Sequence, residues 1–432
     1  MSILKVAHIG AGSFVFGPGV LAGAILEHRM GDVELALMDV DRETVELMAA
    51  VGRRVARDEG LATRLTAHTD RASALDGADF VICSAAPEMQ KRHAMDCRII
   101  DEWIPGHLVT EFGGIAGISN SLRQIAFITQ VAADMRRMAP RAWLLNVANP
   151  LPRVCQAAHE SGVPTVGFCS VSIAGYARLW QMLRGQSLGY PFKEAQEAYD
   201  ATMAGLNHFS WLLALRDRAT GADCMADLRA RLAAGVSWDG PRMDAMARET
   251  GYFPASGDPH TREFLPPEGP PPPRHELWHG NPEERRRRLD LMKNVSEGRL
   301  PWRGLLSQGA WEKPMDLVAA MACGKPVEFN SLNLINGGQI SNLPATAFVE
   351  TRCAGSRRGP VPQATTLPAK VLPFCQRTAQ VTDTIVRAAM NRSRRLVHEA
   401  VELDPTIVDK AAGVRAVDAC LEAHKDAISE YR

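Results

Sequence analysis

Five short polar segments of this chain carry residue types that could do chemistry. In the first, Asn146 and Asn149 offer side-chain amides that could bind a nicotinamide or sugar hydroxyls, or could form an Asx turn. The second contains Cys169, a thiol after a short apolar run, where a buried and inert cysteine is the commoner arrangement. In the third, His208 follows Asn207 beside aromatic residues, a setting that is more typical of a hydrogen-bonded core histidine. Each of these signals is weak alone.

The fourth segment runs from residue 252 to residue 263 and is dense in ionisable groups among Gly and Pro. These groups are Tyr252, Asp258, His260, Arg262 and Glu263. Such density suits a rigid loop better than a helix, and in a loop it favours function over packing. The fifth segment, residues 333–344, is rich in amides that suit sugar or cofactor hydroxyls, or it is a hairpin with an Asn-Gly turn.

A glycine turn near the N-terminus predicts a dinucleotide site. An apolar run from residue 4 to residue 9 is followed by two glycines and then by a helix-like segment, an order that lets the backbone approach a pyrophosphate. Val15 replaces the third glycine of the usual motif, which weakens the signal. The next apolar run ends in an acidic residue that can bind an adenosine ribose and would repel a 2′-phosphate. The predicted NAD contacts are Gly10, Gly12, Ser13, Phe16 and Asp39. The alternative is a structural turn with a solvated aspartate.

Strand-like runs alternate with helical segments over the first 195 residues. The runs are Leu4 to Ile9, Val33 to Met38, Ala78 to Ala85, Trp143 to Val147 and Thr165 to Phe168. This alternation predicts an α/β fold with a Rossmann-type, doubly wound parallel sheet, in which ligands lie beyond the carboxyl ends of the strands. We expect two domains, a NAD-binding domain over residues 1–195 and a mixed α+β domain over residues 196–432 that binds substrate and metal.

Three later segments have clear patterns. The prolines at 266, 267 and 270–273 predict an exposed arm, because proline continues neither a helix nor a central strand. The run Glu283 to Arg288 predicts a solvated helix face with i,i+4 pairs, or else a contact with an anionic substrate or a partner subunit. Apolar residues at helical spacing over Gln376 to Glu402 predict a core helix.

Composition excludes several classes. Lysine and arginine together number 49, as do aspartate and glutamate, so no overall charge points to nucleic acid or an anionic membrane. The nine cysteines form no CxxC pair, which is typical of a reducing compartment. The chain enters a strand at once and has no apolar run of membrane-spanning length, so we expect a soluble cytoplasmic protein.

Taken in order, the motifs resemble the NAD-dependent glycosidases of glycoside hydrolase family 4. The resemblance covers nearly the whole chain and rests on the order of the motifs rather than on any one of them. They read GAGSxxF, the strand ending in Asp39, NxxNP, GFC, GxNHFxW, GYxPxxGDxHxxEFLP and NGGQxxNLPxxAxVET. The last two are most similar to the α-galacturonidase and α-glucuronidase type.

The resemblance implies a mechanism without the carboxylate pair of most glycosidases. Bound NAD⁺ takes a hydride from sugar C3, the ketone acidifies the C2 proton, a base removes that proton, and the glycosidic oxygen leaves by elimination. Water then adds and the hydride returns, so NAD⁺ is not consumed. A divalent metal, typically Mn²⁺, polarises the C2 and C3 oxygens as a Lewis acid.

The resemblance also assigns roles to residues of this chain. Cys169 and His208 match the family's metal ligands, with oxygens completing the coordination shell. Asp258 matches the base that removes the C2 proton, and Tyr252 is the second candidate. The resemblance therefore implies a glycosidase whose small-molecule substrate is an α-glycoside of an acidic sugar, such as a uronide. It also implies assembly as a homodimer or homotetramer.

Substrate contacts and one departure complete the prediction. Asn149 is expected to bind sugar hydroxyls near the nicotinamide, and Asn207 to support the site beside the metal-binding histidine. His260 and Arg262 are candidates for binding an acidic substituent. Ser170 stands where the family commonly has His or Asp as the acid for the leaving group, and a hydroxyl is too weak for that role. Either another group such as His260 acts, or the natural substrates have a good leaving group, or hydrolysis is not the main activity.

Two other functions stay open at this point. A NAD-dependent dehydrogenase of a sugar or hydroxy acid would accumulate NADH with its product, which a cycling glycosidase does not. A non-catalytic sugar sensor that kept the fold would follow if Cys169 and His208 lay too far apart to share a metal.

Overall fold

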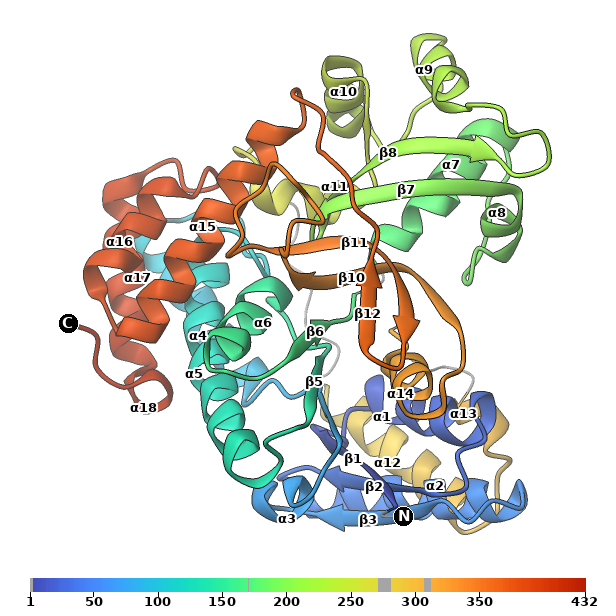
Figure 1. Ribbon diagram of the computed structural model, residues 1–432. Helices are drawn as coiled ribbons and strands as arrows, with labels where there is room; N and C mark the ends of the chain where they lie inside the picture. The colour runs from blue at the N-terminus through green and yellow to red at the C-terminus, as the bar shows by residue number, and fades with distance from the viewer. Residues whose placement is uncertain (1–2, 170, 271–280, 307–311) are drawn as a thin grey trace.

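The computed structural model describes residues 3–169, 171–270, 281–306 and 312–432. Within these residues one mixed sheet runs through the whole molecule, in the strand order β3-β2-β1-β4-β5-β6-β10-β11-β7-β8-β9, with β12 paired to β11 (Figure 1). The strands are β1 (Leu4–Ile9), β2 (Val33–Met38), β3 (Arg64–His68), β4 (Phe80–Cys83), β5 (Trp143–Asn146), β6 (Thr165–Gly167), β7 (Tyr199–Leu206), β8 (Phe209–Asp217), β9 (Phe253–Pro254), β10 (Val327–Ile335), β11 (Phe348–Ser356) and β12 (Gly359–Pro362).

The first six strands form a parallel sheet with the strand order of a dinucleotide-binding fold. Val6 of β1, for example, lies between Leu35 of β2 and Phe80 of β4, and all three side chains are buried. Such apolar runs form central strands because helices cover both faces of the sheet. The predicted doubly wound α/β fold is therefore confirmed. The edge strand β3 was not predicted, because its sequence has no continuous apolar run.

Helices connect these strands. They are α1 (Phe16–Leu21) with its π-helical continuation η1 (Ala22–Glu27), α2 (Arg42–Asp58), α3 (Arg71–Leu75), α4 (Met89–Trp103), α5 (Gly114–Met138), α6 (Leu151–Glu160), the 3₁₀ turn η2 (Val171–Ala174), α7 (Gly175–Arg184) and α8 (Lys193–Ala198). Asp41 caps α2 by accepting a hydrogen bond from the Thr44 amide at 3.2 Å.

The remaining strands are antiparallel. β10 joins the parallel half where Asn333 pairs with Gly167 of β6, and β11 joins β7 where Glu350 pairs with Gly205. The hairpin β7–β8 and the short β9 complete this end of the sheet. The helices here are α9 (Met225–Ala233), α10 (Pro241–Thr250), α11 (Asp258–Thr261) and the 3₁₀ turn η3 (Arg262–Phe264).

The C-terminal half of the chain also packs on the parallel half. The helices α12 (Pro282–Ser296), α13 (Arg303–Leu306) and α14 (Pro314–Cys323) share a hydrophobic core with β1 and β2. The helices α15 (Leu372–Asn391), α16 (Arg394–Leu403), α17 (Lys410–Ala423) and α18 (Lys425–Ile428) gather beside α4 and α5 (Figure 1). The division at residue 195 stays a prediction.

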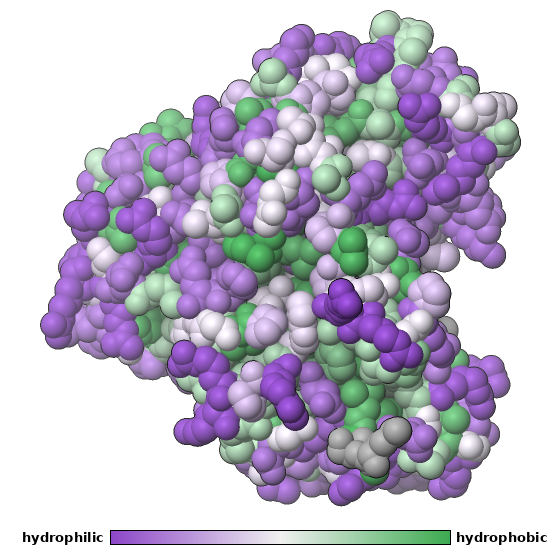
Figure 2. Space-filling view, in the orientation of Figure 1, coloured by the Kyte–Doolittle hydropathy of each residue, from purple (hydrophilic) through white to green (hydrophobic). Residues whose placement is uncertain are grey.

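The long helix α15 belongs to two hydrophobic cores. Cys375 and Ala379, in its first half, pack in the core of the β7–β8 end, whereas Ile385 and Val386 pack in the core around α5. On the face shown in Figure 2, hydrophobic residues gather in the middle, between ends that are mostly hydrophilic.

The predicted helix over Gln376 to Glu402 is wrong as one element. The helix α15 ends at Arg392, which has a positive φ of 50°, and Ser393 then caps α16 by accepting a hydrogen bond from the Leu396 amide. Ile385, Val386, Leu396, Val397 and Val401 of this pattern are buried, as expected of a core helix, whereas Met390 is exposed at the end of α15. Among the described residues, no helix combines the length and apolar character needed to cross a membrane.

Candidate active site

The predicted glycine turn follows β1 and leaves room only for glycine. Gly10 has a φ of +86°, and a Cβ there would lie 2.8 Å from the backbone nitrogen of Ala85. At Gly12 a Cβ would lie 2.7 Å from Asp39 Oδ2. Cβ atoms do not approach other atoms this closely, so a side chain at position 10 would meet the backbone and one at position 12 would displace the Asp39 carboxylate, whereas the bare glycine turn can approach a ligand closely.

Hydrogen bonds hold the turn and the end of β2 together. Asp39 Oδ2 accepts from the Gly12 amide at 2.9 Å, and Oδ1 accepts from the Asp41 amide at 3.1 Å. The Ser13 hydroxyl accepts from the Phe16 amide at 3.2 Å, at the first residue of α1. The carboxylate at the end of β2 is thus fixed beside the turn before any ligand arrives.

A cavity of about 700 Å³ opens along this turn. All five predicted cofactor contacts line it, together with the exposed side chain of Val40 and with Asn149. The volume suits a dinucleotide-sized ligand, and the cavity lies at the carboxyl ends of the parallel strands, where this fold binds such ligands.

The wall of the cavity opposite the turn contains Glu111, which the sequence did not single out. Asn149 Nδ2 donates to Glu111 Oε2 at 2.9 Å. The carboxyl group is open to the cavity, but desolvation by the surrounding protein and the nearby Glu263 carboxylate raise the pKa of Glu111 to about 8, against the effect of the Asn149 hydrogen bond.

His208 stands in the tight turn between β7 and β8, with a positive φ of 60°. It is 2% exposed, and neither ring nitrogen has a hydrogen-bond partner among the described residues. Burial, and to a smaller extent the neighbouring His260, lower the pKa of His208 well below its ordinary value. Buried polar groups normally have a hydrogen-bond partner, so an imidazole that lacks one indicates a missing ligand. A neutral imidazole can bind a metal ion through a ring nitrogen.

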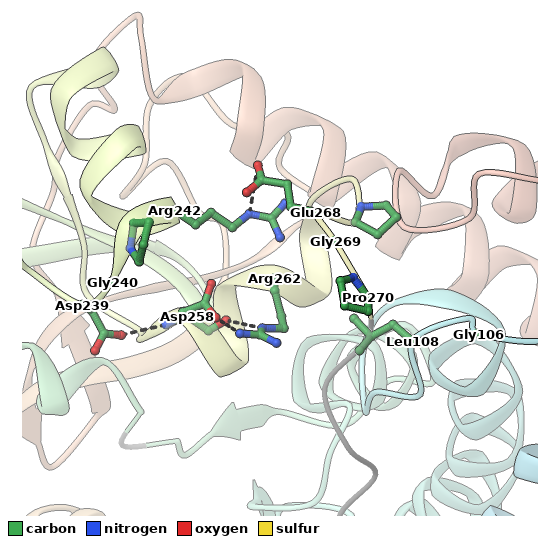
Figure 3. Close-up of a pocket in the computed structure, with 12 residues that line it drawn as sticks. Gly106, Leu108, Asp239, Gly240, Arg242, Asp258, Arg262, Glu268, Gly269 and Pro270 are labelled. Carbon is green, nitrogen blue, oxygen red and sulfur yellow. Dashed lines mark hydrogen bonds and ion pairs between the residues drawn. The ribbon is translucent and has the colours of Figure 1, made fainter.

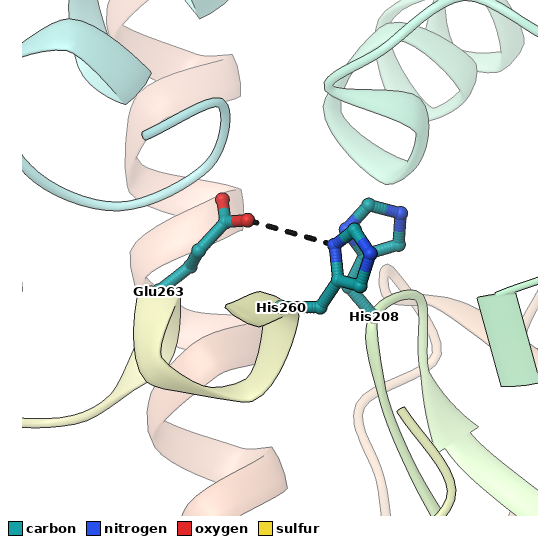
Figure 4. A group of neighbouring side chains, drawn as sticks. All are labelled: His208, His260 and Glu263. Atoms are coloured by element: carbon teal, nitrogen blue, oxygen red, sulfur yellow. Dashed lines mark ion pairs between the residues drawn. The ribbon is translucent and has the colours of Figure 1, made fainter. Parts of the chain in front are cut away.

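Two further side chains meet this histidine (Figure 4). The ligand atoms of His208, His260 and Glu263 all lie within 4.8 Å of one another. The two imidazole rings are 4.5 Å apart between centroids, and His260 Nδ1 lies 3.8 Å from Glu263 Oε1. Two imidazoles and a carboxylate can hold a divalent transition metal. Glu263 was not predicted as a ligand, although its i,i+3 spacing from His260 is the signal for it.

Cys169 lies just after β6 and is not a member of that three-residue group. Burial raises the pKa of its thiol, the Glu350 carboxylate adds to the shift, and a hydrogen bond with Asn207 opposes it. The thiol therefore lies beside the residue that precedes His208. Its pairing with His208 on one metal stays a prediction.

The side chain of Asn207 is held by a hydrogen bond to the buried residue Glu350. Its Nδ2 donates to Glu350 Oε2 at 3.2 Å, and Asn333 donates to the same oxygen at 3.2 Å. Burial raises the pKa of Glu350, although these amides and two serine hydroxyls oppose the shift. Asn336, from the amide-rich segment, donates to backbone carbonyls of its own loop, so it acts there as a structural residue between β10 and β11.

Asp258 and Arg262 face a second cavity, of about 270 Å³ (Figure 3). Their side chains form an ion pair, and the Asp258 amide donates to Asp239 Oδ2 at 2.8 Å. Arg242 and Glu268 form another pair across the same cavity, at 3.6 Å. The short helix α11 and the turn η3 thus present Asp258 and Arg262 to this cavity, and His260 and Glu263 to His208.

The other predictions for this region have different outcomes. Tyr252 is partly buried and packs against the hydrophobic core of the β7–β8 end, and its role as the second candidate for the base stays a prediction. Ser170 and residues 271–273 of the proline arm lie outside the described residues, while residues 266–270 are exposed, as predicted. In the run 283–288, Arg287 and Arg288 pair with Glu284, as predicted for a solvated helix face.

The fold and the site together define a protein that combines a dinucleotide-type cavity with a cluster of metal-ligating side chains. The chain belongs to the family 4 glycosyl hydrolases: the family model described as "Family 4 glycosyl hydrolase" matches residues 5–184, and the model of the "Family 4 glycosyl hydrolase C-terminal domain" matches residues 203–407. The predicted family and enzyme class are therefore confirmed.

Known relatives share the whole length of the chain. It is 26% identical to an alpha-galactosidase of Bacillus subtilis, over 99% of this chain and 100% of that protein. It is 25% identical to an alpha-galacturonidase of the same organism, over 94% of this chain and 93% of that protein. A 6-phospho-alpha-glucosidase from gut microorganisms, solved in complex with NAD and Mn²⁺, has the same fold, with a TM-score of 0.78 and 20% identity over 99% of this chain and 100% of that one.

Proposed function

We propose that this chain is a NAD-dependent, divalent-metal-dependent glycosidase that cleaves an α-glycoside of an acidic sugar, such as a uronide, by deprotonation at C2 and elimination. One observation carries the proposal. Glu111 lines the large cavity, and the backbone amide of the next residue, Phe112, donates to Glu263 Oε2 at 2.8 Å. Neighbouring residues of one loop therefore touch the cofactor cavity and the histidine cluster, so a sugar between them would meet both.

The cavity fits NAD⁺ because its walls need the bare glycine backbone at Gly10 and Gly12 and because Asp39 is fixed beside them. Gly10 and Gly12 would accommodate the pyrophosphate, and Asp39 would accept from the adenosine ribose. When bound, NAD⁺ would accept a hydride from C3 of the sugar and return it at the end of the cycle. The relative solved with NAD and Mn²⁺ supports this assignment.

The histidine cluster fits a divalent metal because the ring nitrogens of the buried His208 have no other partner in the part of the chain that the structure describes. His208, His260 and Glu263 would hold the ion, with Cys169 as the further ligand that the family resemblance implies. When bound, Mn²⁺ or a similar ion would supply Lewis-acid polarisation of two sugar oxygens. Asn149 and Asn207 would bind and orient the hydroxyl groups.

Asp258 is our candidate for the base that removes the C2 proton, with Tyr252 second. In the free protein its carboxylate is paired with Arg262, so proton abstraction requires the guanidinium to find another partner. An acidic group on the sugar offers that partner through a charge-assisted hydrogen bond. The pair thus links the base to a preference for acidic sugars, a preference that the alpha-galacturonidase among the relatives also supports. An imidazole that holds the metal cannot also protonate the leaving oxygen, so His260 acts as that acid only if His208, Glu263 and Cys169 hold the ion without it.

The test is release of nitrophenol from α-linked nitrophenyl glucuronide, galacturonide, sulfoquinovoside, glucoside and galactoside, with NAD⁺ and Mn²⁺ each omitted in turn, in water and in D₂O. We expect cleavage of an acidic member that needs both cofactors and leaves deuterium at C2. Cleavage without deuterium at C2 would reject the elimination. Accumulation of NADH from free sugars, with no cleavage, would identify a dehydrogenase instead. The oligomeric state and the cytoplasmic location stay predictions.

A further inference from the structure

The helix α12 belongs to the C-terminal half of the chain but packs along α2, the helix that follows Asp39 at the end of β2 (Figure 1). Arg285, in its first turn, forms an ion pair with the Asp41 carboxylate and donates to Thr44 Oγ1 at 3.2 Å. Both partners belong to the start of α2. A residue far away in sequence therefore holds the loop that follows Asp39.

Arg285 is connected through Asp41 to the carboxylate of Asp39, the residue expected to bind the cofactor. The Asp41 side chain that Arg285 contacts also caps α2, and the Asp41 amide donates to Asp39 Oδ1 at 3.1 Å. Asp39 Oδ2 is in turn held by the Gly12 amide. The position of Asp39 thus depends on a chain of contacts that begins outside the parallel half.

Charge gives the same residue a second role. Asp39 and Asp41 bring two carboxyl groups to the cavity's end, and Asp39 lines the cavity itself. Desolvation opposes ionisation of Asp41, but hydrogen bonds from Thr44 and the charge of Arg285 outweigh it and lower the pKa of Asp41. One turn further along α12, the Arg288 guanidinium lies 6.0 Å from the ring centre of Phe14 in the glycine turn. Two arginines of α12 therefore contact residues that lie next to cavity-lining ones, Arg285 at Asp41 and Arg288 at Phe14.

We propose that Arg285 positions Asp39 for the adenosine ribose and that, in a chain without Asp39, it favours NADP⁺ over NAD⁺. With Asp39 present, Arg285 fixes the loop so that the carboxylate accepts from the ribose hydroxyls. Without Asp39, the same guanidinium, which contacts Asp41 two residues further along, would be a cation near this end of the cavity and would favour a 2′-phosphate. The inference rests on the proposed binding of NAD⁺.

The pair is half exposed, with 43% of the Arg285 side chain and 34% of the Asp41 side chain accessible, so its loss should leave folding intact. A matched control lies two positions along. Arg287 carries the same charge on the same helix, but its described ion pair is with Glu284. Arg287→Gln therefore removes an equal charge without touching the contact to Asp41.

The experiment is calorimetric titration of the full-length chain with NAD⁺ and with NADP⁺, in the absence of sugar and at fixed salt. Arg285→Gln should weaken NAD⁺ binding about three- to fivefold, the range for a partly exposed ion pair, whereas Arg287→Gln should match the wild type. Asp39→Ser should admit NADP⁺, and adding Arg285→Gln should remove that binding while adding Arg285→Lys should keep part of it.

Equal NAD⁺ affinity in Arg285→Gln and Arg287→Gln would overturn the positioning role. NADP⁺ binding to Asp39→Ser that persists after Arg285→Gln would overturn the specificity role. A wild-type chain that binds no NAD⁺ would reject the proposed function together with this inference, so the two failures are distinguishable.

Discussion

The side-chain amide of Asn149 donates a hydrogen bond of 2.9 Å to Glu111, and the two side chains form one wall of the large cavity. Asn149 belongs to the loop after β5, and Glu111 to the loop before α5. The contact therefore closes the cavity between two connections of the parallel sheet. It also occupies one oxygen of a carboxyl group whose pKa is raised to about 8.

We expect Glu111→Gln to flatten the pH dependence of thermal stability in the metal-free protein. Above pH 4.5 the unfolded chain loses a proton that the folded chain keeps until about pH 8, so the native state loses stability as the pH rises through this window. Melting temperatures in the presence of a chelator, measured from pH 5 to pH 8, test this. The control is Glu430→Gln at an exposed position. An unchanged slope in Glu111→Gln would show that another group titrates there.

Gly12→Ala should weaken NAD⁺ binding by about tenfold or more, because the new Cβ would displace Asp39 and cost one or two hydrogen bonds to a carboxylate. Calorimetry with NAD⁺ alone measures the loss. Gly189→Ala is the matched control, since a Cβ there meets no atom within 4 Å. If Gly12→Ala bound NAD⁺ as the wild type does, the turn would not contact the dinucleotide.

His208→Ala should reduce Mn²⁺ affinity about a hundredfold or more, because it removes the buried ligand with two unpartnered nitrogens. Titration of the apoprotein with MnCl₂ gives the affinity directly. His159→Ala, at an exposed histidine on α6, should bind Mn²⁺ normally.

Cys169→Ala separates the two possible ligand sets. We expect it to abolish activity together with the dependence on metal, as the family resemblance implies. The same titration with MnCl₂, combined with the glycosidase assay, checks this. An active variant that still needs metal would restrict the ligands to His208, His260 and Glu263 and leave the thiol as part of the core.

Asp258→Asn should lower turnover about a hundredfold or more and leave NAD⁺ affinity unchanged, because the amide cannot accept the C2 proton. Glu268→Gln is a matched control in the same cavity, since Glu268 is also paired with an arginine. Exchange of the C2 proton with D₂O is the direct readout. If Asp258→Asn exchanged the C2 proton at the wild-type rate, Asp258 would not be the base and Tyr252 would become the first candidate.

The parts of the fold that the sequence predicted are those that local pattern determines. The run Val33 to Met38 is β2 to the residue, because a central strand covered on both faces is mostly apolar and only Glu34 departs from this pattern. The strand β3 was missed, since at the sheet edge only Leu65 is buried. The break at Arg392 was missed because no glycine or proline marks it, although Ser393 is a good helix cap.

The candidate site was predicted one residue at a time but not as an assembly. His208 and His260 were chosen for their residue types, yet their approach depends on the β7–β8 turn and on α11, which pair only in the folded molecule. The ion pair of Asp258 with Arg262 follows from i,i+4 spacing that the loop interpretation did not consider. Arg285 contacts Asp41, near the cofactor cavity, through a tertiary ion pair that no local sequence pattern predicts.

The double anchorage of α15 has a mechanical consequence. Because α15 is embedded both in the core around α5 and in the core of the β7–β8 end, a hinge motion that separates the two ends of the molecule would have to bend this helix or break one of these cores. Admission of substrate then falls to small movements of loops and side chains, such as the release of Arg262 from Asp258. We therefore expect a scaffold that stays rigid during turnover, with motion confined to loops and side chains of the active site.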